Sequence, residues 1–335
     1  MTPAPAVPVP VPRPASSPAA SSVPAHRAPS GLVIAGATFA LFLVWSHTFL
    51  AFEVLLAPKS GPAPFDWLGL TVARFAPVTI LCAAWCFGVK RRESIAIVRA
   101  HPGRLLLCGA LAVPVYNAAL YYGMEHHVAG PIASLLTTLS PLYLLILGTV
   151  VLKERLTWRK GIGLALGLTG VVLIAKGKAP TGAGFALPVV VLALAPLAWS
   201  VHTFLSKPMT RTHSPVLWTY LALVTGGLPL LLVLPFHGGP QMAALGTTGV
   251  LLLAYLALFA TIGGFALWTW LLKYLPASTV GLTIFLNPPL TTAGKWVLSR
   301  VRPEAFTFSI TPLEWVGGAV SLLGVAVAVL SRKRV

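Results

Sequence analysis

The chain contains about ten long apolar segments, joined by short loops in which Lys and Arg are alternately abundant and scarce. An apolar segment of about 20 residues crosses the hydrocarbon layer of a membrane as an α-helix, because a helix satisfies its own backbone hydrogen bonds there. Hydrophobic residues make up 56% of the 335 residues and charged residues only 9%, which excludes a water-soluble globule. The segments predict an all-α polytopic membrane protein with little room for a soluble domain.

Ten predicted spans leave only short connections between them. They cover about residues 32–52, 67–88, 103–123, 128–151, 160–176, 184–206, 215–236, 249–272, 278–299 and 314–331. The segment before them, residues 1–30, is rich in Pro, Ala and Ser and has no continuous apolar stretch. Such a composition cannot pack a core, so we expect a disordered cytoplasmic tail rather than a signal peptide.

Basic residues are divided unequally between the two sides of these spans. With successive loops assigned to alternate sides, 17 of the 24 Lys and Arg residues lie on one side and five on the other, while Arg74 and Lys295 lie inside spans. Because Lys and Arg accumulate in cytoplasmic loops, both termini are predicted to be cytoplasmic, as an even number of spans also requires. The net charge of +17 does not indicate nucleic acid, since the basic residues border apolar segments instead of forming one polar surface. We expect a protein of the cytoplasmic membrane.

The two halves of the chain repeat one pattern at a spacing of 154 residues. The corresponding pairs are Trp45-Ser46 and Trp199-Ser200, Thr157 and Thr311, Gly163 and Gly317, and Gly170 and Gly324; at a spacing of 147, Ser140-Pro141 corresponds to Asn287-Pro288. The predicted repeats cover residues 31–178 and 179–335, with five spans each. Because five is odd, the second repeat enters the membrane from the opposite side. Inverted repeats of this kind are typical of secondary transporters, whose site lies between the halves near the membrane midplane.

Several short motifs carry a resemblance to a known family. They are Trp45-Ser46-His47-Thr48-Phe49, Arg74-Phe75, Tyr121-Tyr122-Gly123-Met124, Ala133-Ser134-Leu135-Leu136, Ser140-Pro141 and Glu154-Arg155-Leu156-Thr157. In their order and duplication the chain resembles the drug/metabolite transporter superfamily, and within it the EamA-like family. Lys153 departs from the family pattern, which has Gly there, and the second repeat has no Glu at the place that corresponds to Glu154. The resemblance implies a ten-helix carrier of small metabolites, often an exporter of amino acids, that works by alternating access.

A metabolite site is mostly apolar with a few placed polar groups. The candidates for substrate binding are Trp45, Ser46, His47, Arg74, Tyr116, Asn117, Tyr121, Trp199, Ser200, His202, Trp268, Asn287 and Lys295. Proline interrupts helices by removing a backbone hydrogen bond, and the candidates for hinges are Pro141, Pro288 and Pro289. Static bends are the alternative interpretation of these prolines.

Charged residues inside spans are costly and usually face a polar cavity or a partner. Arg74 either lies near the substrate or hydrogen-bonds neighbouring helices. Lys295 is expected to have no neighbouring acid in the membrane, so it either receives a substrate carboxylate or extends to the membrane surface. None of the seven acids lies in the middle of a predicted span, which disfavours an organic cation as substrate. Neutral, zwitterionic or anionic substrates fit better.

His47 and His202 follow the repeated Trp-Ser pairs and titrate near neutral pH, so they are candidates for a polar pair in the cavity or for proton linkage. Histidines that hydrogen-bond between helices are the alternative. We expect coupling to protons or to exchange, and a monomer or a homodimer.

Other classes of protein have weaker support. A channel needs a continuous polar lining, which these spans do not show, and a receptor or scaffold without transport has no distinguishing feature. An intramembrane enzyme is disfavoured because the chain has only one Asp and lacks a G-x-S-x-G elbow, an H-E-x-x-H motif and a P-loop. Cys82, Cys86 and Cys108 have no second ligand pair, so we expect neither a metal site nor a cofactor.

Overall fold

The computed structural model describes residues 29–56, 58, 62–126, 136–151, 153–176, 187–303 and 311–329. All secondary structure in these ranges is helical, which confirms the predicted all-α class. The predicted tail, residues 1–30, falls outside them except for its last two residues.

Six helical stretches in the described part are long and apolar enough to cross a membrane. They are Gly31–Leu56, Trp67–Val89, Pro102–Glu125, Val190–Thr212, Pro215–Val233 and Thr247–Tyr274. Two further apolar helical stretches, Ser140–Val150 and Trp315–Ala328, are shorter. The predicted number of ten spans is therefore not reached by helix length and composition alone.

The helix bounds follow the predicted spans closely, with two additions. The helices are α1 (Gly31–Leu56), α2 (Trp67–Ala84), α3 (Arg91–Ala100), α4 (Pro102–Ala110), α5 (Tyr116–Glu125), α7 (Ser140–Val150), α8 (Trp158–Lys176), α9 (Leu187–Thr212), α10 (Pro215–Val233), α11 (Gly239–Ala243), α12 (Thr247–Ala254), α13 (Gly264–Tyr274), α14 (Ala277–Leu282), α15 (Asn287–Val301) and α16 (Pro312–Val329). The sequence did not predict α3 and α11. α3 has Glu93 in its first turn, Arg99 in its last turn, and buries only Ser94 and Ile97, so its charges made it resemble a loop.

Wide helical turns interrupt two of the long stretches and end a third. The π-helical segments are η1 (Trp85–Val89), η2 (Leu111–Val115) and η3 (Tyr255–Gly263). Such segments leave backbone carbonyls free for other donors and often occur at functional sites. Both η2 and η3 supply such carbonyls beside the cavity described below.

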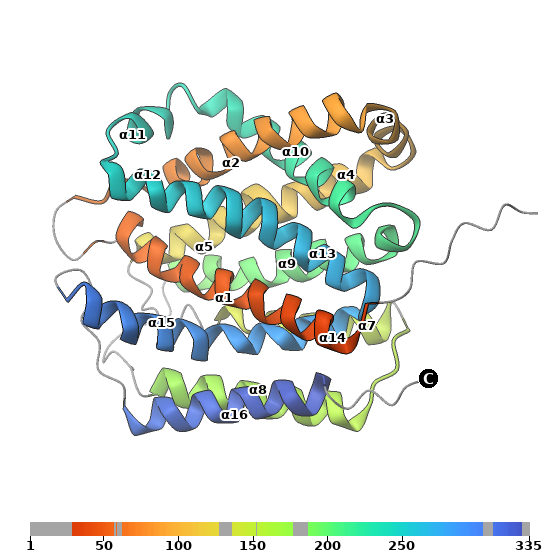
Figure 1. The fold of residues 1–335 in the computed structure, drawn as a ribbon, viewed down its shortest axis with the longest axis vertical. Helices are drawn as coiled ribbons and strands as arrows, with labels where there is room; N and C mark the ends of the chain where they lie inside the picture. Colours follow the sequence, from red (N-terminus) through yellow and green to blue (C-terminus); the bar gives the residue numbers. More distant parts are fainter. Residues whose placement is uncertain are drawn as a thin grey trace, which may run out of the picture.

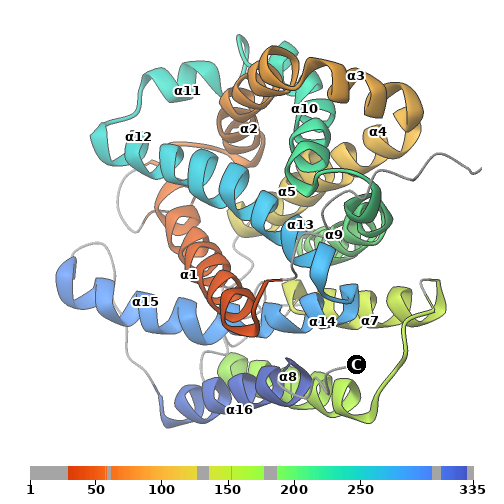
Figure 2. The same cartoon turned by 45° about the vertical axis from the view of Figure 1, so that its right-hand side comes forward.

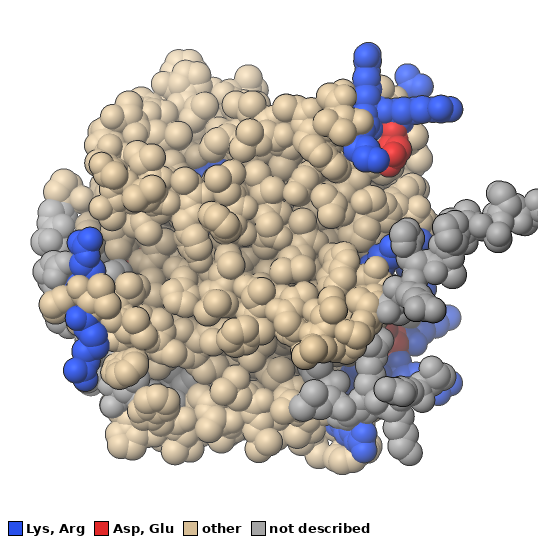
Figure 3. Space-filling model, in the orientation of Figure 1, with Lys and Arg blue, Asp and Glu red and all other residues tan. Residues whose placement is uncertain are grey.

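The helices form one bundle in which the start of α1 and the end of α16 lie at the same end of the molecule (Figure 1). That end also carries α3 and the connection between α9 and α10. Figure 3 shows Lys and Arg side chains at both ends of one face, with a broad band between them that is almost free of charge. We call the end with α3 the basic end. The band has the pattern of a membrane-crossing surface.

Helices of the two halves pack against each other in reciprocal pairs. α1 packs against α15, and α9 packs in the same way against α7, while α2 contacts α10 and α8 contacts α16. In both views α8 and α16 form a layer below α7, α14 and α15 (Figure 2). Each first helix thus lies against a late helix of the other half.

The α8–α16 contact has the symmetry that the repeat predicts. A Cβ atom on Gly163 would lie 2.8 Å from the carbonyl oxygen of Gly324, and one on Gly170 would lie 2.5 Å from that of Gly317. Gly163 corresponds to Gly317 and Gly170 to Gly324, so the contact is self-complementary, as in a two-fold interface. Small residues allow this close approach of backbones.

The matched prolines lie where helices begin. Pro141 is in the first turn of α7, after a turn at residues 138–139, and Pro288 and Pro289 are in the first turn of α15, after a 3₁₀ segment, η4 (Thr283–Leu286). Proline fits the first helical turn, where its missing N–H costs nothing. These positions are breaks between helical segments, and their predicted hinge role stays a prediction.

Candidate functional site

A cavity of about 170 Å³ lies between the two halves. Its walls come from α1, α2, α5, α9, α13 and α15 and from the two helix breaks before α7 and α15. An engineered cavity of about 150 Å³ is large enough to bind benzene, so this one accommodates a small organic molecule. Discontinuous helices commonly form the substrate sites of transporters.

The cavity extends away from the basic end. Three helices line it over nine residues each, from Trp45 to Glu53 in α1, from Tyr116 to Met124 in α5 and from Asn287 to Lys295 in α15. The eight steps from the first to the last of these residues rise about 12 Å. All three helices finish at the end opposite the basic end (Figure 1). The last residues of the three ranges, Glu53, Met124 and Lys295, therefore lie at the end of the cavity farther from the basic end, which we call its mouth.

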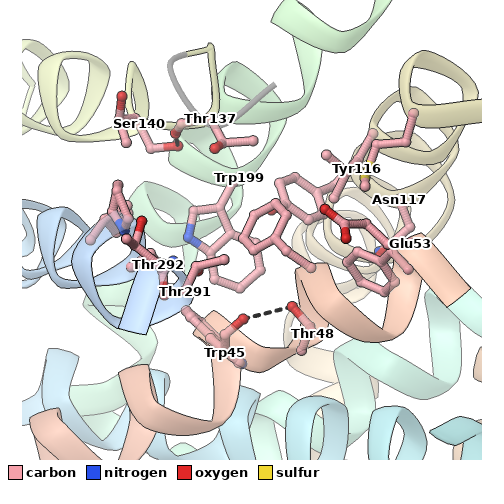
Figure 4. A pocket seen from close by; sticks show the side chains of 18 of the residues that line it. Trp45, Thr48, Glu53, Tyr116, Asn117, Thr137, Ser140, Trp199, Thr291 and Thr292 are labelled. Atoms are coloured by element: carbon pink, nitrogen blue, oxygen red, sulfur yellow. Dashed lines mark hydrogen bonds between the residues drawn. The ribbon is translucent and has the colours of Figure 1, made fainter. Parts of the chain in front are cut away.

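Aromatic rings form the floor of the cavity. The ring centroids of Trp45 and Trp199 are 5.4 Å apart, and those of Trp199 and Phe265 are 5.0 Å apart. The indole Nε1 of Trp45 donates to the carbonyl oxygen of Ala260 in η3 at 2.9 Å. Trp199 projects between Tyr116 on one side and the threonines of α15 on the other (Figure 4). These rings separate the cavity from the basic end.

Hydroxyl groups and the two amides of Asn117 and Asn287 supply the neutral polar part of the lining. The hydroxyls belong to Thr48, Tyr116, Thr137, Thr138, Ser140, Thr291 and Thr292. The Thr48 hydroxyl donates to the carbonyl oxygen of Trp45 at 2.7 Å, within α1. The Thr291 hydroxyl donates to the carbonyl oxygen of Ser46 at 3.0 Å, from α15 to α1. The Oδ1 atom of Asn287 is buried without a hydrogen-bond partner among the described residues, which leaves an acceptor in the wall.

Arg74 is the most deeply buried charge in the lining, with 4% of its surface exposed. Its guanidinium donates to Thr261 Oγ1 at 2.8 Å, to Tyr121 Oη at 2.5 Å and to Asn117 Oδ1 at 3.4 Å. Asn117 in turn donates to the carbonyl oxygens of Ala112 and Val113 in η2, both at 3.0 Å. An arginine within a span costs about 2.5–3.5 kcal/mol on insertion scales, and these neutral acceptors offset part of that cost. Among the described residues it has no carboxylate partner.

An ion pair lies near the mouth of the cavity. Lys295 Nζ is 2.8 Å from both carboxylate oxygens of Glu53, which joins α15 of the second half to α1 of the first. The expectation that Lys295 has no neighbouring acid is therefore wrong. The predicted first span ended at residue 52, whereas α1 continues to Leu56 and places Glu53 inside the helix.

Comparison with known proteins places this architecture in a family. The profile of the EamA-like transporter family matches the chain twice, over residues 32–176 and 186–330. The chain belongs to the EamA-like transporter family. This confirms the resemblance that the sequence motifs gave, and it makes the chain a multi-pass membrane transporter rather than an enzyme.

Relatives of this EamA-like transporter carry transporter names. The chain is 29% identical over 289 residues to a "Probable terminal-alkyne amino-acid exporter" of Streptantibioticus cattleyicolor, with 84% of this chain and 89% of that protein covered. It is 23% identical to the "Uncharacterized inner membrane transporter YedA" of Escherichia coli K12, with 81% and 86% covered. A crystal structure with a TM-score of 0.65 and 24% identity covers 90% of this chain and 98% of its own, which supports the fold.

Seven of the thirteen predicted binding residues of this EamA-like transporter line the cavity. They are Trp45, Arg74, Tyr116, Asn117, Trp199, Asn287 and Lys295, and the hinge candidate Pro288 lines it too. Six others lie outside the lining: Ser46, His47, Tyr121, Ser200, His202 and Trp268. The Tyr121 hydroxyl accepts a hydrogen bond from Arg74. Trp268 is fully buried, and its Nε1 donates to Thr203 Oγ1 at 3.1 Å.

The predicted histidine pair does not form. His47 Nδ1 is 2.7 Å from the carbonyl oxygen of Leu43 in its own helix, and His202 Nδ1 is 3.0 Å from that of Cys108 in α4. A carbonyl oxygen only accepts, so each Nδ1 carries the proton. His202 thus hydrogen-bonds between helices, as the structural alternative expects, whereas His47 bonds within its own helix.

Sequence reasoning missed a polar and aromatic stripe on α1. Its members Trp45, Thr48, Phe49, Phe52 and Glu53 all line the cavity and follow the spacing i, i+3, i+4, i+7 and i+8. That spacing marks one face of a helix. Extending the predicted span by four residues would have revealed the stripe. No three His, Cys, Asp or Glu side chains in the described part are grouped as metal ligands.

Proposed function

We propose that this chain is a secondary transporter that exports an amino acid or a similar small metabolite across the cytoplasmic membrane by alternating access. Ten spans in two inverted repeats, residues 31–178 and 179–335, belong to this proposal, as do cytoplasmic termini. In this proposal the ten crossings are the six long helical stretches together with α7, α8, the α14–α15 segment and α16. The common end of α1 and α16, and the basic residues at that end, support the orientation (Figures 1 and 3).

The contact of Trp45 with Trp199 carries the proposal. These residues occupy corresponding positions in the two family matches, and their rings meet on the floor of the cavity. A floor built from both halves opens when the halves move relative to each other, which is the motion that alternating access requires. The amino-acid class comes from the three charges in the lining and from the printed name of the Streptantibioticus relative. Coupling to protons or to exchange, and the oligomeric state, stay predictions.

The test uses purified protein in liposomes and L-propargylglycine, an amino acid with a terminal alkyne. We expect saturable uptake of the labelled compound that speeds up when the liposomes are preloaded with the unlabelled one. Such trans-stimulation distinguishes a carrier from a channel. No uptake of this compound or of L-leucine, or uptake without saturation and trans-stimulation, would contradict the proposal.

Variants locate the transport path. Trp45→Ala and Trp199→Ala should each lower uptake at least about tenfold, because losing one of these large aromatic side chains removes more than the 1.4 kcal/mol that a tenfold change requires. Trp296→Ala is the matched control, since Trp296 is 44% exposed on α15 and does not line the cavity. Size-exclusion profiles and melting temperatures confirm folding. Unchanged uptake in both folded variants would remove the cavity from the path.

A further inference from the structure

The Glu53–Lys295 ion pair has few other contacts. Lys295 Nζ bonds to both oxygens of Glu53 at 2.8 Å, and the structure shows no other hydrogen bond for either side chain among the described residues. The side chains are 38% and 23% exposed, and both line the cavity. Each charge can therefore reach a molecule in the cavity once the pair separates.

The surroundings of the pair make an uncompensated charge unfavourable. Phe49, Phe52, Leu120 and Met124 line the same outer part of the cavity. A charge without a partner is less well solvated beside these side chains than in water, so a molecule that satisfies both charges replaces the pair more readily than one that satisfies a single charge. Carboxylate–ammonium contacts are short, charge-assisted hydrogen bonds, so such contacts with a substrate can replace the one between Glu53 and Lys295.

We infer that Glu53 and Lys295 form the binding site for the charged end of a zwitterionic α-amino acid. Lys295 binds the substrate carboxylate, and Glu53 binds the substrate ammonium, so two substrate contacts replace the internal ion pair. This inference rests on the proposed transport function and specifies its substrate class. A monoanion would displace Glu53 and leave it unpaired, and a cation would leave Lys295 unpaired, so only the zwitterion keeps both charges of this pair compensated.

The shape of the cavity determines which side chains the substrate can have. The pair lies about 12 Å along the helices from the level of Trp45 and Asn287. With its charged end at the mouth, an amino acid directs its side chain toward the aromatic floor formed by Trp45, Trp199 and Phe265. The site therefore favours amino acids with apolar side chains. Asn287 Oδ1 is a hydrogen-bond acceptor at the inner end of the cavity.

Competition with the wild-type protein tests the inference first. L-leucine, L-leucinamide and N-acetyl-L-leucine share one side chain and differ in charge, as zwitterion, cation and anion at neutral pH. Each is added to liposomes taking up labelled L-propargylglycine. We expect L-leucine to inhibit at least about tenfold more strongly than either analogue, since a hydrogen bond to a charged group contributes about 1.5–3 kcal/mol. Equal inhibition by the three compounds would overturn the inference without any variant.

Two substitutions then assign the two ends of the zwitterion. Glu53→Gln should strengthen inhibition by N-acetyl-L-leucine, relative to inhibition by L-leucine, about tenfold. Lys295→Gln should strengthen inhibition by L-leucinamide, relative to inhibition by L-leucine, by a similar factor. Glu93→Gln is the control, because Glu93 forms an exposed pair with Lys90 at 3.2 Å, outside the cavity. Unchanged ratios in folded variants that still carry L-propargylglycine would overturn the inference and leave the proposed function intact. Absence of uptake by the wild type would instead refute the proposed function.

Discussion

The two ends of the bundle each contain an acid and a lysine that connect the two halves, but the two pairs have different surroundings. At the basic end, Glu154 accepts hydrogen bonds from the backbone N–H groups of Ala277 at 2.7 Å and Ser278 at 3.3 Å, and from the Ser278 hydroxyl. Lys160 Nζ lies 3.7 Å from Glu154 and donates to Ser278 Oγ at 2.6 Å. At the other end, Glu53 bonds only to Lys295 in the described part of the chain.

This difference separates a structural contact from an exchangeable one. The side chains of Glu154 and Lys160 are 13% and 11% exposed, and the backbone of α14 holds the carboxylate in place. Nearby, Lys207 donates to the carbonyl oxygens of Leu272 and Leu275 and so ties α9 to the end of α13. The basic end is thus closed by several interlocking bonds, while the pair at the cavity is free to exchange its partner for a substrate.

Stability measurements should show the largest contrast between the two acids. Glu154→Ala removes three hydrogen bonds and leaves Lys160 without its acid, so we expect a loss of about 3 kcal/mol in the free energy of unfolding. Glu53→Ala breaks a more exposed pair and should cost about 1 kcal/mol or less. Denaturant unfolding of both variants in one detergent measures the two values. Equal losses would mean that the two pairs have the same structural role.

A smaller effect should appear in the layer that carries Lys160. Gly163→Val places a Cβ atom 2.7 Å from Ala328 Cβ and 2.8 Å from the carbonyl oxygen of Gly324, so α8 must move from α16. We expect a loss of about 2 kcal/mol from this overpacking.

Gly161→Val is the matched control for that substitution. It lies one half-turn away on the same helix with nothing within 4 Å of its Cβ position, and the loss should stay within about 0.5 kcal/mol. If both variants lose the same free energy of unfolding, the α8–α16 contact contributes little to the stability of the basic end.

Much of the fold was predictable from the sequence because lipid imposes simple rules. Apolar length predicted the helices. The spacing of 154 residues paired Gly163 with Gly317 and Gly170 with Gly324, and all four glycines lie in the α8–α16 contact. The paired Trp45 and Trp199 were predicted to share a cavity for the same reason, and their rings are in contact. The prolines indicated breaks, and Pro141 and Pro288 begin helices at matched breaks.

The remainder depends on contacts between distant residues. Nothing near Lys295 in the sequence indicates Glu53, which lies 242 positions away. The support of Arg74 by Thr261 needs the wide turns of η3, and no local pattern predicts a π-helix. His47 and His202 face different carbonyls, because His47 follows Trp45 by two residues whereas His202 follows Trp199 by three, which puts them on different sides of their helices.

The central claim is that the cavity opens away from the basic end and receives the substrate there. The direct measurement is labelling of Thr292→Cys, in the cavity wall, by a thiol reagent that does not cross membranes. The three native cysteines are buried and give little background. We predict that intact cells are labelled from outside and that L-propargylglycine slows the reaction. Labelling from the cytoplasmic side alone, or at a rate that the amino acid leaves unchanged, would contradict the account.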